Sequence, residues 1–183
     1  MRHLGVSPPG CMPYFGSRGS YHSTKLPLHQ TSSFAGAVLK AAWNSQHQKL
    51  TTSDEKGLII VWVLHKGMWF EEMLNSRTQS VVRGMKWQAS GERICIAYED
   101  STVIVGSVDG NRVWGKDVVP GGTIDGAEWS PDGKLLLFVV NKNTLKTFSS
   151  NGNPLEEVAL PGGQGAGDQQ VNIKALHWYD GME

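Results

Sequence analysis

The sequence predicts an all-β fold built from a repeated four-stranded sheet. One marker is a tryptophan that follows a β-branched residue by five positions, and it occurs at Trp43, Trp87, Trp129 and Trp178. The spacings are 44, 42 and 49 residues. Residues five apart lie on opposite faces of a strand, so each marker segment offers an apolar group to both sides.

Glycine-containing turns mark the repeat a second time, at Lys66-Gly67, Asp109-Gly110 and Asn151-Gly152. The glycines Gly67, Gly110 and Gly152 are 43 and then 42 residues apart. Asp-Gly and Asn-Gly are strong signals for two-residue hairpins, in which both central residues take positive φ. Polar turn residues give a third marker, because Asp54, Glu99 and Asn141 keep a similar spacing. Three markers with one period indicate a structural repeat.

Each unit is predicted to hold four strands. They are 37–44, 48–53, 57–64 and 67–74 in the first unit, 80–88, 92–98, 101–108 and 111–117 in the second, and 122–130, 134–140, 143–149 and 153–160 in the third. A fourth unit begins near residue 171 with one strand. The run Leu58–Val61, which leads into Trp62, is apolar at odd and even positions alike. A strand with this pattern has apolar side chains on both faces, and both faces therefore have to be covered.

Four antiparallel strands every 40 to 45 residues, with tryptophans and Asp/Gly turns, are typical of a WD-repeat β-propeller. Three blades and one strand do not close a ring, which takes about four to eight blades. We therefore predict an incomplete propeller over residues 36–183 and interpret the chain as a fragment.

Residues 1–35 are predicted to be a disordered or non-native leader. The first acidic residue is Asp54, and an acid-free, Arg-bearing start superficially suits an organelle transit peptide. Pro8, Pro9 and Pro13 prevent the amphipathic helix that such a peptide needs. A start other than Met1 in the natural protein is the third alternative.

Composition gives no sign of an enzyme. The 17 basic residues balance the 17 acidic ones, so nucleic acid and anionic membranes are not indicated, and there is no long apolar run for membrane insertion. The two cysteines and six histidines show no metal-ligand spacing. The run 161–168 is Gly-rich but lacks the Lys-Ser/Thr ending of a phosphate loop. We expect no catalytic, cofactor or metal site.

Trp69 and Phe70 are the candidate partner contact, since adjacent aromatics on an outer strand can anchor another protein. The alternative is that one ring packs inward and the other covers a loop.

Several segments between residues 38 and 183 resemble one known family. They are 48–63, 66–67 with 71–73, 80–83, 94–96, 98–117 and 177–179. They are similar to the N-terminal propeller of the WD-repeat subunit of intraflagellar transport complex A. The resemblance implies a non-enzymatic scaffold with two propellers and a helical-repeat tail in the whole protein, and a role in retrograde ciliary transport, cilium assembly and delivery of proteins to cilia. It also implies other subunits of that complex and cargo proteins as partners, at the cilium, the ciliary base and in the cytoplasm.

The alternative is a tubby-like protein with N-terminal WD repeats that serves as a ubiquitin-ligase adaptor. One departure from regular WD repeats concerns their buried polar tetrad. The stretch 33–37 has no histidine, and only the first unit pairs a turn aspartate, Asp54, with Trp62. The tetrad is therefore not expected.

Overall fold

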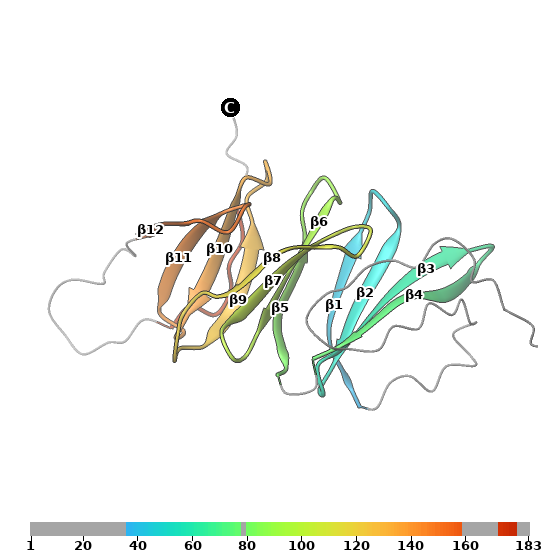
Figure 1. Ribbon diagram of the computed structural model, residues 1–183, viewed down its shortest axis with the longest axis horizontal. Helices are drawn as coiled ribbons and strands as arrows, with labels where there is room; N and C mark the ends of the chain where they lie inside the picture. Colours follow the sequence, from blue (N-terminus) through green and yellow to red (C-terminus); the bar gives the residue numbers. More distant parts are fainter. Residues whose placement is uncertain (1–35, 78–79, 159–171, 179–183) are drawn as a thin grey trace, which may run out of the picture.

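The computed structural model describes residues 36–77, 80–158 and 172–178, and the elements within them are β-strands (Figure 1). Blade 1 contains β1 (Val38–Asn44), β2 (Lys49–Asp54), β3 (Leu58–His65) and β4 (Met68–Ser76). Blade 2 contains β5 (Val82–Trp87), β6 (Arg93–Tyr98), β7 (Thr102–Ser107) and β8 (Arg112–Asp117). Blade 3 contains β9 (Ile124–Trp129), β10 (Leu135–Val140), β11 (Thr144–Ser149) and β12 (Pro154–Val158). The predicted all-β class is confirmed.

Each blade is an antiparallel meander whose strands follow the order of the sequence. The first strands of successive blades, β1, β5 and β9, lie next to one another, and the sheets stand side by side (Figure 1). Strands with consecutive order, joined by short turns, are the architecture of propeller blades. The structure therefore confirms an open, incomplete propeller.

The core lies between the blades. One cluster joins blades 1 and 2 and includes Val61, Met85 and Ile96. A second joins blades 2 and 3 and includes Cys95, Val105 and Phe138. Because β6 and β7 are covered on both faces, their apolar residues do not alternate with polar ones, as expected for a doubly buried sheet.

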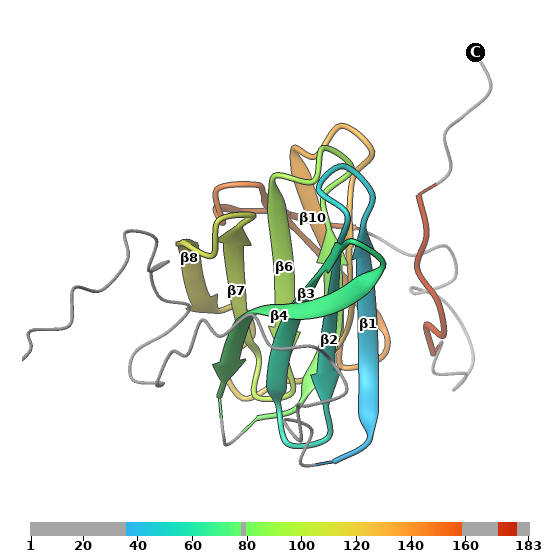
Figure 2. The ribbon, with the colours of Figure 1, turned by 90° about the vertical axis from the view of Figure 1, so that its right-hand side faces the viewer.

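A β-bulge recurs in the innermost strand of each blade. The pairing register skips Leu39, Arg83 and Asp125, which are 44 and 42 residues apart. An extra residue in one strand increases the local right-handed twist. Figure 2 looks onto the face of blade 1 that points away from blade 2, and it shows β4 crossing the blade at a steep angle to β1.

The hairpin glycines are all left-handed, but the turns are of two kinds. Lys66 and Gly67 both have positive φ, 51° and 77°, as a two-residue turn requires. The other two turns are three-residue loops closed between Ser107 and Asn111 and between Ser149 and Asn153, and only their glycines have positive φ. Here a type I turn is followed by a left-handed glycine, so the expectation of two positive φ angles holds only at Lys66-Gly67.

Residues 172–178 are not paired into a sheet, although a strand was predicted there. Their one backbone bond within the described part of the chain runs from Ile173 N to Lys142 O, at 2.7 Å. Ile173, Leu176 and Trp178 pack against an apolar cluster of blade 3 that contains Val139. A strand needs a continuous ladder with a neighbour, and side-chain packing alone does not provide one.

Candidate interaction surface

Each marker tryptophan of the three blades starts a row of side chains that crosses its blade. The rows are Trp43–Leu50–Trp62–Glu71, Trp87–Ile94–Gly106–Arg112 and Trp129–Leu136–Phe148–Pro154. Residues paired directly across strands share one face. We call the face that carries this row the incoming face of a blade and the opposite face its outgoing face.

The incoming face packs on the preceding blade. The indole of Trp87 donates to Thr51 Oγ1 in blade 1 at 3.1 Å, and that of Trp129 donates to the Lys86 carbonyl of blade 2 at 3.1 Å. Trp178 packs on blade 3. Trp43 lies on the incoming face of blade 1 and is 50% exposed. The same sequence pattern thus gives a buried or an exposed indole, depending on the neighbouring blade.

A side-chain amide contact between blades repeats along the chain. The amide of Asn44 donates to the Gly91 carbonyl at 2.8 Å, and the amide of Gln88 donates to the Gly133 carbonyl at 2.6 Å. Both amides directly follow a marker tryptophan and reach a turn of the next blade. Their 44-residue spacing is a signal that the sequence reasoning missed.

Basic residues at the start of a blade's second strand make the other repeated contact. Lys49 Nζ donates to the Val108 carbonyl at 3.1 Å and pairs with Glu72 at 2.6 Å. Arg93 donates to the Ser150 carbonyl at 3.2 Å. In both cases the cation of one blade reaches the outer hairpin of the next. These residues are also 44 apart and were not singled out from the sequence.

Blade 3 presents a different outgoing face. Ser130 takes the place of Asn44 and Gln88, and its hydroxyl bonds to Asp132 within the same turn at 2.6 Å. That bond, together with the Lys134 backbone N–H, lowers the pKa of Asp132 below its usual value. The face itself carries Leu137, Val139 and Leu145. Its contact with residues 172–178 is therefore mainly apolar.

Asp54 and Trp62 serve separate local contacts. Asp54 is fully buried, and its Oδ1 accepts the backbone N–H groups of Lys56 and Leu58 at 2.9 Å each. The indole of Trp62 donates to Thr52 Oγ1 at 2.8 Å. The aspartate therefore holds the β2–β3 turn, and the tryptophan is fixed by a neighbouring strand.

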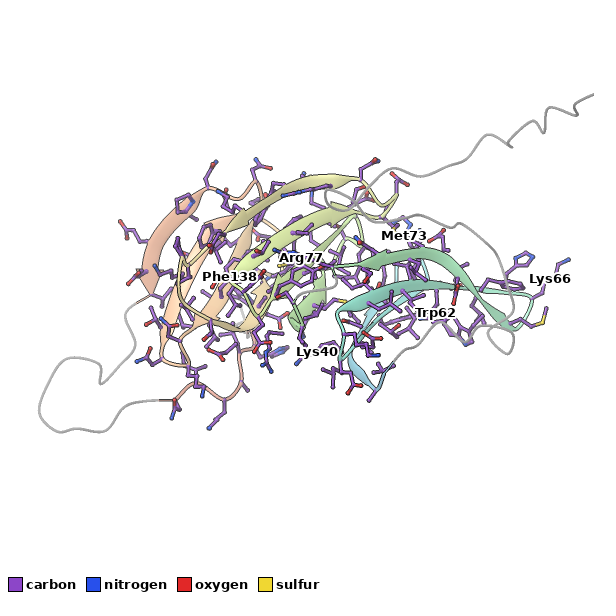
Figure 3. The ribbon with its side chains drawn as sticks, turned by 60° about the horizontal axis from the view of Figure 1, so that its bottom comes forward. Lys40, Trp62, Lys66, Met73, Arg77 and Phe138 are labelled. Atoms are coloured by element: carbon purple, nitrogen blue, oxygen red, sulfur yellow. The ribbon has the colours of Figure 1, made fainter. Side chains whose placement is uncertain are left out.

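Trp69 and Phe70 lie on opposite faces of β4, and both are half-buried. The Trp69 ring meets Trp43 edge to face with centroids 6.3 Å apart, whereas Phe70 meets His65 at 6.2 Å. Exposed Leu64 is the cross-strand partner of Trp69. Figure 3 places Lys66 at the tip of this hairpin, away from Phe138 and blade 3.

A cavity of about 310 Å³ lies along the innermost strands. Its charged lining residues are Lys40, Arg83, Lys86, Asp125, Glu128 and Lys174. Lys86 pairs with Glu128 at 3.0 Å, and Arg83 pairs with Glu99 at 2.6 Å. The residues that line this cavity include no Ser, Thr, Cys or His, so it brings together no hydroxyl or thiol nucleophile with a histidine base.

The described residues offer no metal centre or membrane-spanning helix. They contain no group of three or more His, Cys, Asp or Glu that could hold a metal ion, and no helix long and apolar enough to cross a membrane. Cys95 is fully buried in the core, and this burial raises the pKa of its thiol far above the ordinary value. The Gly-rich run 161–168 lies outside the described residues.

A family model described as "WDR35/TULP4 N-terminal" matches residues 15–183. The chain belongs to this β-propeller family. The family unites the two proteins that the sequence resembled, a WD-repeat protein and a tubby-like protein. Its match begins inside the predicted leader 1–35, which lies outside the described residues.

The curated relatives in this family differ in similarity. WD repeat-containing protein 35 of Homo sapiens is 47% identical over 170 residues, which is 91% of this chain and 14% of that protein. The Mus musculus protein of the same name is 46% identical over 170 residues, with the same shares of both chains covered. Tubby-related protein 4 of Homo sapiens is 33% identical over 123 residues, which is 67% of this chain and 8% of that protein. The chain thus spans about one seventh of the first two relatives.

Solved structures show the same fold. The β-propeller domain of Cps50 (Swd1) from Myceliophteria thermophila aligns with a TM-score of 0.54 at 13% identity, over 63% of this chain and 39% of that one. A chain of the mitotic checkpoint complex aligns with a TM-score of 0.57 at 16% identity, over 66% and 37%. These propellers therefore share a blade architecture with this chain.

Proposed function

We propose that the chain is part of a non-enzymatic scaffold subunit of intraflagellar transport complex A. It would act in retrograde ciliary transport, cilium assembly and delivery of proteins to cilia. The observation that carries the proposal is the 47% identity to WD repeat-containing protein 35 over 91% of the chain, against 33% over 67% for tubby-related protein 4. The sequence resemblance supplies the link from that propeller to ciliary transport.

The geometry supports a scaffold role rather than catalysis. Blade-to-blade contacts such as Asn44 with Gly91 and Lys49 with Val108 engage polar side chains of the interfaces in hydrogen bonds within the fold. The exposed residues Trp43 and Leu64 lie on a sheet face, where large apolar side chains can bind another protein. Partners would be other subunits of the complex and protein cargo, at the cilium, the ciliary base and in the cytoplasm.

Affinity purification of the full-length protein from ciliated cells tests the proposal. Recovery of the other complex A subunits, together with retrograde transport defects on depletion that the full-length protein rescues, is the expected result. A full-length variant without residues 36–158 should fail to rescue. Recovery of ubiquitin-ligase subunits without complex A subunits would replace the proposal by the tubby-like adaptor function.

A further inference from the structure

The outer hairpin of blade 3 carries the one Asn-Gly pair of the sequence. Asn151 is followed by Gly152, and none of the other asparagines precedes a glycine. Asn151 is exposed in the three-residue loop that is closed between Ser149 and Asn153. Asparagine is thermally labile, because the backbone nitrogen of the next residue can attack its side-chain amide carbon. A following glycine has no Cβ to crowd this attack, so Asn151 is where the reaction is least hindered.

The folded hairpin holds the attacking nitrogen away from this reaction. The Gly152 N–H donates to the Ser149 carbonyl at 2.8 Å, and the Gly152 carbonyl accepts the ammonium of Lys116. Gly152 also lies against the Trp114 ring, since a Cβ built on it would be 2.8 Å from that ring. Ring closure requires the nitrogen to lose its proton and to turn toward the Asn151 side chain. The bond to Ser149 therefore has to break first.

The position of β12 makes local opening of this hairpin easy. β12 is the last strand of its sheet and pairs only with β11 in the described part of the chain. All five of its residues, Pro154–Val158, are exposed. The free energy of local opening is lowest where few apolar contacts are buried. The hairpin can therefore open while the rest of blade 3 stays folded, and the open form frees the Gly152 nitrogen.

The folded chain has room for the acid that this reaction produces. The outer hairpin of blade 2 has the same three-residue loop, in which Asp109 and Gly110 take the places of Asn151 and Gly152. Asn151 Oδ1 lies 3.5 Å from Nη1 of Arg93 in blade 2. A carboxylate at this position would replace a long contact between a neutral amide and a cation by an ion pair between blades 2 and 3.

We propose that Asn151 is a site of spontaneous deamidation, and that its aspartate product pairs with Arg93 across the interface of blades 2 and 3. In the opened hairpin the Gly152 nitrogen bonds to Cγ of Asn151 and the bond from Cγ to the side-chain nitrogen breaks. The proton of the attacking nitrogen passes through water to the leaving nitrogen, which departs as ammonia. Water then opens the cyclic imide to aspartate or isoaspartate, with no oxidant or reductant.

The two products differ in how they fit the hairpin. Isoaspartate adds a carbon to the backbone of the three-residue loop, so it is incompatible with the bond from Ser149 N to Asn153 O. Aspartate keeps the backbone as it is. The inference does not depend on which complex the protein serves.

Peptide mapping by mass spectrometry tests the reaction in the whole 183-residue chain. The chain is incubated at pH 8 and digested at intervals, and chromatography separates aspartate from isoaspartate. We expect Asn151 to be converted at least ten-fold faster than Asn153. That residue shares the hairpin but precedes Pro154, whose nitrogen has no proton to lose. Conversion of Asn151 no faster than that of Asn153 overturns the proposal.

The role of hairpin opening is tested with the unfolded chain and two variants. The chain unfolded in guanidinium chloride should convert Asn151 at least ten-fold faster than the folded chain. Lys116→Met removes the cation on the Gly152 carbonyl and should speed conversion in the folded chain at least two-fold. Lys56→Met, at an exposed turn of blade 1, is the control and should leave the rate unchanged. Equal rates in the folded and unfolded chains, or in the two variants, overturn the opening step.

The Asn151→Asp variant tests the pairing of the product. Its urea unfolding midpoint should lie above that of the unchanged chain, and Arg93→Gln should remove this gain. Because the pair is exposed, the gain should be small and should disappear at high salt. A lower midpoint for Asn151→Asp, or a gain that survives Arg93→Gln, overturns the pairing with Arg93.

Discussion

The Lys49–Glu72 pair is the sharpest test of how blades 1 and 2 are held together. Lys49 joins the two blades, because it pairs with Glu72 of its own blade and donates to the Val108 carbonyl of the next. The two side chains are only 11% and 19% exposed. Lys49→Met therefore leaves a largely buried carboxylate without its counter-charge.

Removing one partner of a buried pair costs about 3–5 kcal/mol, and we expect the lower end here because Glu72 keeps some solvent contact. The slope of urea unfolding is about 1–3 kcal/mol per molar, so the midpoint should fall by roughly 1–3 M. The assay is urea unfolding of the chain followed by tryptophan fluorescence, since Trp87 lies in the same interface.

The double variant Lys49→Met/Glu72→Gln should recover most of that loss, because it removes the unpaired charge and leaves a loss of about 1 kcal/mol for the Val108 bond. Lys146→Met is the matched control. Its pair with Glu157 lies within blade 3 and is more exposed, so its loss should stay below about 1 kcal/mol. A Lys49→Met loss no larger than that of the control, or a double variant weaker than the single one, would refute the reasoning.

Three further outcomes are expected. A Cβ at Gly152 (φ 81°) would lie 2.8 Å from the Trp114 ring, so Gly152→Ala should lower the melting temperature more than Gly67→Ala (φ 77°), which has open space around it. Burial raises the pKa of Tyr98 to about 12, above its ordinary 10, so the unfolded chain ionises first and stability falls as pH rises from 10 to 12. Tyr98→Phe should abolish this contribution to the fall in the free energy of unfolding, which is up to about 2–3 kcal/mol. Urea unfolding at each pH measures it, and a pH profile unchanged by the substitution would contradict the expectation. In a Cys11→Ser background, Cys95 should resist thiol reagents at pH 8 until the chain unfolds, and rapid labelling of the native chain would show an exposed thiol.

The strands could be predicted because their signals are local. Strand residues such as Ile59 and Val61 are β-branched, and left-handed glycines such as Gly67 mark the ends of hairpins, so period and turn chemistry together specify each blade. The strand predicted at residues 172–178 failed for a different reason. Its apolar pattern indicated burial correctly, but burial does not supply a hydrogen-bonding neighbour.

The interaction surface was harder to predict because its chemistry depends on distant residues. The local patterns around Trp43 and Trp129 are alike, yet the first is 50% exposed and the second 4%. Glu71 was one of several acids in the sequence, and only the pairing of β3 with β4 shows that it lies opposite Trp62. Lys49 and Asn44 could have been found by extending the 44-residue comparison to every polar position, since their counterparts are Arg93 and Gln88.

The side-chain amides and cations that join the blades donate in one direction along the chain, and this gives the stack two unlike ends. Asn44, Lys49, Gln88 and Arg93 all donate toward the blade that follows in the chain. Two such stacks that met with equivalent faces would place donors against donors, so a two-fold symmetric contact could not reproduce these bonds. Blades that use this chemistry can be joined only head to tail, and the order of the repeats is therefore encoded in a few polar side chains as well as in the chain connectivity.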